Sequence, residues 1–157
     1  HGGERRYYHS EVGVNSRLDA LQAGVLLVKL QYLEEWHTGR ARNATIYNDI
    51  FATAGDIGIV APLPPTFPAR HIWNQYILRV KDGKRDVLRE HLTEQGIGSD
   101  IYYPVPLHMQ ECFSDLDGLP MPETERASHE TVALPIFPEL EREQVEYVAN
   151  TIVEFLT

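Results

Sequence analysis

The sequence predicts an α+β fold, in which a long helix precedes a small sheet covered by helices. Apolar residues keep helical spacing from residue 17 to about 53, and short strand and helix patterns alternate after that point. The chain has 157 residues, 43% of them hydrophobic, which is enough for one core. We therefore expect a polar loop and helix cap over residues 1–16, the long helix over 17–53 and a small α+β domain over 54–157.

The long helix is predicted from two apolar stripes, which consist of Leu18, Leu21, Val25, Val28 and Tyr32 and of Leu26, Leu30, Leu33 and Trp36. If unbroken, this helix would be roughly 55 Å long, whereas a globule of this chain length is about 40 Å across. Its first half should therefore protrude and lack a packing partner. Gly39 is the expected point of bending, after which Ala44, Tyr47 and Phe51 resume the spacing.

A polar segment leads into this helix. Gly13 relaxes the backbone, and Asn15 or Ser16 is expected to cap the first turn. Free N–H groups and the positive end of the helix dipole would then form an anion site. An ordinary capped helix without a ligand is the alternative.

The remaining elements follow from local signals. The proline-rich residues 61–68 are expected to be an extended connector, Asp82-Gly83 a turn, and Gly96 a left-handed helix cap. The predicted strands and helices are, in order, a strand over 71–80, a helix over 85–95, a strand over 99–103, a helix from Pro122 or Glu123, a strand over 131–135 and a helix over 141–156. The last helix should bury Val145, Val148, Ile152 and Phe155.

Composition excludes several classes of function. The formal net charge of −9 opposes binding to nucleic acid, and no apolar run is long enough to cross a membrane. Cys112 is the only cysteine, so no internal disulfide can form and a cytoplasmic location is expected. The chain opens without an initiator methionine or a signal sequence, and we expect it to be part of a longer polypeptide.

Two polar clusters are candidates for chemistry. Tyr103 and His108 lie on a proline-rich loop after a predicted strand, where either ligand contacts or purely local hydrogen bonds are possible. Tyr7, His9 and Asn15 precede the long helix, where terminal fraying is the alternative. The scattered histidines and lone cysteine show no metal-ligand spacing, and no Gly-x-Ser-x-Gly elbow of a serine hydrolase is present.

Three motifs occur in a characteristic order along the chain. They are Tyr7-x-His9 with Gly13-x-Asn15-x-Arg17-x-Asp19-x-x-Gln22-Ala23, then Tyr103-Pro104-x-Pro106-Leu107-His108, then Leu134-Pro135-Ile136-Phe137-Pro138. Together they resemble the carboxy-terminal part of the DegT/DnrJ/StrS family of sugar-nucleotide aminotransferases. That family uses pyridoxal 5′-phosphate (PLP) on a fold-type I scaffold and moves an amino group, usually from glutamate, to a keto sugar on a nucleoside diphosphate.

The resemblance implies roles for individual residues. Asn15 would reach the PLP phosphate of the neighbouring subunit in a homodimer, and Tyr7, His9, Tyr103 and His108 would lie on the substrate side of the site. Residues 102–110 favour deoxythymidine-diphosphate keto-deoxysugars as substrates.

The same resemblance places the Schiff-base lysine outside these motifs. No catalytic residue is therefore expected in this chain, and the chain alone should be inactive, without covalently bound cofactor.

The alternative is a non-enzymatic acidic α+β module. In that case Leu21, Val25 and Val28 of the long helix would bind another protein or a second copy of this chain.

Overall fold

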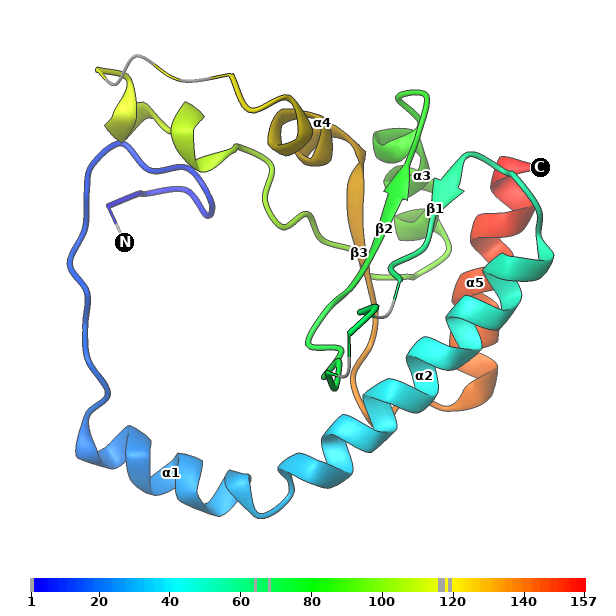
Figure 1. Ribbon diagram of the computed structural model, residues 1–157, viewed down its shortest axis with the longest axis horizontal. Coiled ribbons are helices and arrows are strands. Elements are labelled where there is room, and N and C mark those ends of the chain that lie inside the picture. The colour runs from blue at the N-terminus through cyan, green and yellow to red at the C-terminus, as the bar shows by residue number, and fades with distance from the viewer. Residues whose placement is uncertain (1, 64, 68, 116–117, 119) are drawn as a thin grey trace.

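The predicted α+β class is confirmed by the computed structural model, which describes residues 2–63, 65–67, 69–115, 118 and 120–157 (Figure 1). Within those residues the helices are α1 (Ala20–Leu30), α2 (Leu33–Thr53), α3 (Arg85–Glu94), α4 (Pro122–Glu130) and α5 (Arg142–Leu156), and the strands are β1 (Ile59–Val60), β2 (Tyr76–Val80) and β3 (Thr131–Leu134). Two short 3-10 helices, Leu107–Met109 and Glu111–Phe113, lie between α3 and α4.

The sheet is antiparallel with β2 in the centre, and its register pairs Ile59 with Val80 and Tyr76 with Leu134. Side chains alternate along β2, so that Tyr76, Leu78 and Val80 are buried on the core side. Helix α2 packs against α5, α5 packs against α3, and α4 lies against β2. The sheet is thus covered by helices, as the sequence predicts (Figure 1).

An aromatic cluster joins α2 to the sheet. The ring centroids of Tyr47 and Tyr76 are 4.7 Å apart, and both side chains are fully buried. Their hydroxyls donate to the Pro135 carbonyl and to Oδ1 of Asn48, respectively. Burial raises the pKa of both phenols well above the ordinary value, so they remain neutral donors.

The segment between β3 and α5 is held by side chains of α2. Tyr47 donates to the Pro135 carbonyl, Arg40 to that of Ile136 and Asn43 to that of Phe137. Arg42 donates to the carbonyls of both Pro138 and Leu140. These carbonyls have no sheet or helix partner, so the side chains of α2 satisfy them.

The single helix predicted over 17–53 is wrong, because the helix is interrupted at Gln31 and Tyr32. Their N–H groups bond three residues back, to Val28 and Lys29, which tightens the backbone and ends α1. The protrusion of the first half is confirmed, since no residue of α1 is buried and the helix extends away from the sheet (Figure 1). Among the described residues, therefore, no buried side chain of α1 anchors this helix to the rest of the domain.

The bend expected at Gly39 is not observed, because α2 continues through this residue. A Cβ on this residue would lie 2.8 Å from both Cβ and the carbonyl oxygen of Pro138, so glycine allows α2 to approach the segment before α5.

The expected cap at Asn15 or Ser16 is also wrong. Helix α1 begins at Ala20, and the carboxylate of Asp19 accepts from the Gln22 N–H at 2.8 Å. The best-placed amide at this helix start is therefore already bonded to a negative charge, which disfavours the predicted anion site there. Among the described residues, Asp19 fixes the helix start without an ion pair to Arg17.

Two strand predictions were too long. The strand predicted over 71–80 begins only at Tyr76, because Trp73 has a φ of +51° and its N–H donates to the His71 side chain. The strand predicted over 99–103 is reduced to one bridge between Asp100 and Ala133. Pro104 and Pro106 prevent its continuation.

Most of the other predicted elements are confirmed. Gly96 has a φ of +73° after α3, Pro122 opens α4, and the Asp82-Gly83 turn has positive φ at both residues. Phe155 is 37% exposed and stacks on His91, contrary to its predicted burial. The connector contains no helix or strand where the structure describes it, and its residues 64 and 68 lie outside the described part.

The close contact at Gly39 leads to a first prediction. Gly39→Ala should lower the free energy of unfolding by about 1–3 kcal/mol, because the added methyl group forces α2 and Pro138 apart. Chemical denaturation of the 157-residue chain measures this.

Gly24→Ala is the matched control for this experiment. A Cβ at Gly24 in α1 meets no atom within 4 Å, so the substitution should raise helix content and stabilise α1 locally by up to about 1 kcal/mol. If Gly39→Ala were as stable as Gly24→Ala, the tight approach of α2 to Pro138 would be refuted.

Candidate functional site

Residues 2–13 form a loop closed by its own backbone, which we call the arm. The Glu11 N–H donates to the Gly2 carbonyl at 2.9 Å, and the Tyr8 N–H donates to the Arg5 carbonyl at 3.1 Å. A Cβ on Gly2 would lie 1.8 Å from the Glu11 carbonyl oxygen. The absence of a side chain at this glycine therefore permits the closure.

The arm lies against the proline loop, which comprises residues 101–113 and connects the Asp100 bridge to α4 (Figure 1). The Cys112 N–H donates to the His9 carbonyl at 3.1 Å, and Arg6 forms a 3.1 Å ion pair with Asp100. Segments about a hundred residues apart in the sequence are thereby placed side by side.

Three tyrosines pack where the arm meets the proline loop. The ring of Tyr7 makes edge contacts with Tyr102 and Tyr103, at centroid distances of 5.9 and 5.3 Å. The Arg6 guanidinium lies 4.5 Å from the Tyr7 ring centroid. Burial raises the pKa of Tyr102, and neighbouring Asp100 adds to the effect, so this phenol stays protonated.

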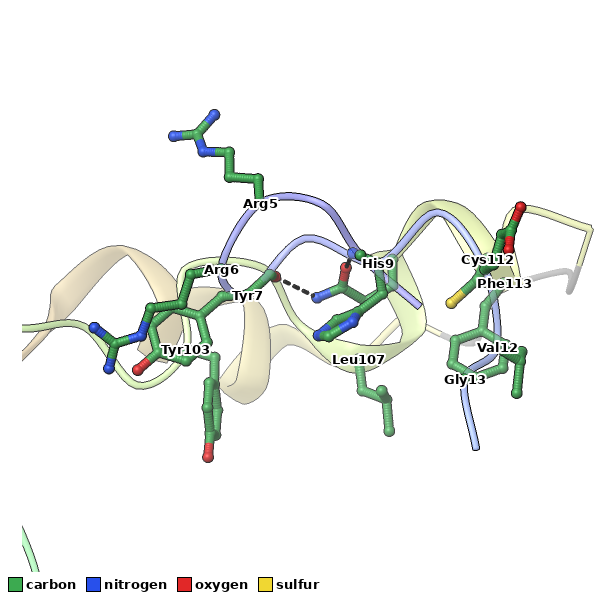
Figure 2. A pocket seen from close by; sticks show the side chains of 13 residues that line it. Arg5, Arg6, Tyr7, His9, Val12, Gly13, Tyr103, Leu107, Cys112 and Phe113 are labelled. Atoms are coloured by element: carbon green, nitrogen blue, oxygen red, sulfur yellow. Dashed lines mark hydrogen bonds between the residues drawn. The ribbon is translucent and has the colours of Figure 1, made fainter. Parts of the chain in front are cut away.

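Gln110 holds the arm through its side-chain amide, and the sequence analysis missed it. Its Oε1 accepts from the His9 N–H at 3.0 Å, and its Nε2 donates to the Tyr7 carbonyl at 3.0 Å, as the dashed lines in Figure 2 show. Nε2 also donates to the Val105 carbonyl at 3.4 Å. The only sequence signal was a polar residue in an otherwise partly apolar loop.

Two adjoining pockets lie on either side of this contact. Their volumes are about 600 and 510 Å³, and they share one wall, made of Tyr7, His9, Tyr103, Leu107 and Gln110. Arg5, Arg6 and Cys112 extend the first pocket (Figure 2). Tyr102, Pro106 and the α4 residues Thr124, Ala127 and Ser128 extend the second.

The structure brings together three of the five predicted site residues, Tyr7, His9 and Tyr103. His108 lines neither pocket, and its Nε2 lies 3.3 Å from Oε1 of Glu125 on α4. Asn15 is exposed in the segment between the arm and α1, apart from the shared wall.

Glu125 fastens the proline loop to α4. Its carboxylate accepts from the Met121 N–H at 3.0 Å as well as contacting His108. The Met121 hydrogen bond, followed by that of His108, lowers the pKa of Glu125. The ionised carboxylate thus stabilises this corner of the site.

The described residues offer little to bind a cofactor or metal. No group of three or more metal-ligating side chains is found among them. Lys29 lies in α1 and Lys81 and Lys84 flank the turn after β2, so no lysine lines either pocket. Asn15 is the one residue that the family resemblance predicts to contact a phosphate, and it lines neither of these two pockets. No helix in the described region has the length and apolarity that a membrane span requires.

This small α+β domain, with a polar site at its amino-terminal arm, corresponds to the carboxy-terminal region of PLP-dependent aminotransferases. The chain belongs to the DegT/DnrJ/EryC1/StrS aminotransferase family, whose model matches residues 1–153. It is 42% identical to a "Pleiotropic regulatory protein" of Geobacillus stearothermophilus, and the match covers 99% of this chain and 41% of that protein. It is 34% identical to a dTDP-3-amino-3,4,6-trideoxy-alpha-D-glucose transaminase of Streptomyces venezuelae, with coverage of 99% and 40%.

Solved structures agree with these relatives. The S. venezuelae DesV structure in complex with a ketimine intermediate superposes with a TM-score of 0.77 at 32% identity, and the match covers 99% of this chain and 41% of that one. The ntda structure of Bacillus subtilis, with bound cofactor PMP, gives 0.78 at 28% identity, covering 92% and 34%. The family is thus PLP-dependent, and this chain spans about two fifths of the length of its curated relatives.

The lowered pKa of Glu125 leads to a prediction for pH. A carboxyl group whose pKa is lowered in the folded state stabilises that state at pH values above the ordinary pKa of a glutamate. This contribution is lost as the pH falls through the lowered pKa of the folded state. Glu125→Gln keeps the acceptor for Met121 but removes the charge. The wild type should therefore unfold at a higher temperature than this variant near neutral pH, and the difference should shrink towards acid.

Thermal unfolding followed by circular dichroism at a series of pH values measures this difference. Glu94→Gln, at the exposed end of α3, is the control for removing one surface carboxylate. If the difference in unfolding temperature between the wild type and Glu125→Gln grew towards acid, the lowered pKa of Glu125 would be contradicted.

Proposed function

We propose that this chain is the carboxy-terminal part of a PLP-dependent aminotransferase that moves an amino group, from glutamate, to a nucleoside-diphosphate keto-deoxysugar. One observation carries the proposal. Tyr7, His9 and Tyr103, all taken from the motifs of the family, converge from distant segments on the shared wall of two pockets. Relatives named as dTDP-sugar and UDP-sugar aminotransferases support this substrate class.

The polar residues of the shared wall suit a sugar nucleotide. The hydroxyl of Tyr103 and the imidazole of His9 offer hydrogen bonds to sugar hydroxyls, and Tyr7 presents an aromatic edge. Arg5 and Arg6 line the larger pocket and offer positive charge. We propose that His108, bonded to Glu125, contributes by holding the proline loop beside the substrate.

Asn15 is proposed to donate to the PLP phosphate of a neighbouring subunit. Its exposure on the segment before α1 leaves its amide available to a second chain. Helix α1 next to it exposes Leu21, Val25 and Val28 to between 60% and 86%, which supports a homodimer in which a partner covers them.

This region is proposed to act without a catalytic residue of its own. When bound, PLP withdraws electrons from the carbon that carries the amino group, and that chemistry needs a lysine amine beside it. The three lysines of this chain lie away from both pockets. We therefore propose that residues 1–157 bind and orient substrate, and that they are inactive alone. We further propose a cytoplasmic location, with which the single cysteine agrees, and no nucleic-acid partner, in view of the net charge of −9.

A non-enzymatic interaction module is the second candidate. Its support is the unburied apolar surface of α1 and the name of the Geobacillus relative, which describes a regulatory protein. In that case α1 would bind a partner protein or a second copy, and the arm would carry no substrate. Substitution in the shared wall separates the two candidates.

Substitution of His9 tests the proposed enzyme. In the full-length polypeptide that carries this region, His9→Ala should lower kcat/KM for a keto sugar nucleotide about tenfold to a hundredfold, because a hydrogen bond from the shared wall to the substrate is lost. Amino transfer from glutamate, followed by the 2-oxoglutarate released, measures the effect. His129→Ala, on the exposed side of α4, should leave kcat/KM unchanged.

If the His9→Ala and His129→Ala variants had equal activity, the shared wall would not be part of the substrate site. Absence of amino transfer in the wild-type polypeptide itself would favour the interaction module.

The isolated chain provides a second test. Added PLP should produce no saturable visible absorption band and no amino transfer, because no lysine lines either pocket. A spectrophotometric titration, with free lysine as the chemical reference, measures this. A stoichiometric band together with turnover would show that the region is active alone.

A further inference from the structure

The arm is held by polar bonds and by the edge contacts of the Tyr7 ring, without a buried side chain of its own. None of the residues 2–13 is buried, so no arm side chain belongs to the hydrophobic core. The ion pair of Arg6 with Asp100 is largely exposed, with 69% of the Arg6 side chain accessible, and exposed pairs stabilise weakly. The position of the arm therefore depends on its partly buried hydrogen bonds and on the ring contacts of Tyr7.

Gln110 makes those bonds. It is 6% exposed, and both ends of its side-chain amide form hydrogen bonds. The Oε1 atom accepts from the His9 N–H, and the Nε2 group donates to the carbonyls of Tyr7 and Val105. A buried amide that is fully paired fixes its partners, because breaking any one bond leaves a polar group without solvent.

We propose that Gln110 is a positioning residue of this site, whose side-chain amide locks the backbone of Tyr7 and His9 to the proline loop and so forms the shared wall. The inference rests on the proposed function for the statement that this wall meets the sugar nucleotide. The bond pattern requires an amide. A carboxylate of the same size keeps the acceptor for His9 but turns an oxygen towards the carbonyls of Tyr7 and Val105.

Gln110→Glu keeps the size of the side chain, so it distinguishes the effect of lost hydrogen bonds from the effect of lost volume. In the ¹⁵N-labelled 157-residue chain, hydrogen exchange at the Cys112 amide reports arm docking, because this amide donates to the His9 carbonyl. Gln110→Glu should lower its protection factor about tenfold or more at neutral pH, and the ring-to-ring NOEs between Tyr7 and Tyr103 should disappear.

Acid gives the distinguishing signature. When its carboxyl is protonated, the glutamate variant regains an O–H donor for the Tyr7 carbonyl, so protection and NOEs should return as the pH falls. Gln110→Ala has no such donor and should stay unprotected at every pH. The wild type measured at the same pH values is the control for other effects of acid on the chain.

Two controls keep the result interpretable. Gln95→Glu, exposed after α3, should leave the arm unchanged, and the protection of the core amides of β2 shows that each variant is folded. Wild-type protection of the Cys112 amide in Gln110→Glu, or loss without recovery in acid, would overturn the proposal. Failure of the proposed function would instead show as full activity in His9→Ala and would not alter these exchange rates.

Discussion

The carbonyls between β3 and α5 are the constraint on which the remaining architecture depends. Pro135 and Pro138 have no N–H group, so this segment cannot continue the sheet ladder, yet its carbonyls lie close to the core. The side chains of α2 satisfy five of them, and Gly39 lets the helix come close enough. The direction of α2 is thereby fixed against both β3 and α5. That direction decides where α1 leaves the domain (Figure 1).

Elements with strong local signals were predictable from the sequence. The left-handed Gly96 after α3, Pro122 at the start of α4 and the apolar spacing of α5 each depend on neighbours within a turn. The break at Gln31 and Tyr32 carries no glycine or proline, and within the described part of the chain no residue of α1 is buried against another element. The two-residue β1 exists only because β2 offers it an edge, which no local pattern reveals.

The site was predictable in its residue types but not in its geometry. Tyr7, His9 and Tyr103 were found because they lie in motifs that resemble a known family. Gln110 was not found from the sequence, because its hydrogen bonds join it to residues of the arm that lie 101 and 103 positions away in the sequence. Spacing likewise could not show that Glu125 holds His108, since that contact joins residues 17 apart in the sequence. The Asp19 cap of α1 is local, and an aspartate at this place is an N-cap signal that the sequence does carry.

The way in which the arm is anchored affects how the site can work. An element without buried apolar side chains, held by a few hydrogen bonds, opens locally at a free energy below that of global unfolding. The shared wall exists only while the arm is docked, so the apparent affinity of a ligand that contacts both sides falls with the docked fraction. By mass action the same ligand stabilises the docked arm. Binding of such a ligand and completion of the pocket wall are therefore one coupled equilibrium, and a partner that covers α1 would shift it by restricting the segment that leads to the arm.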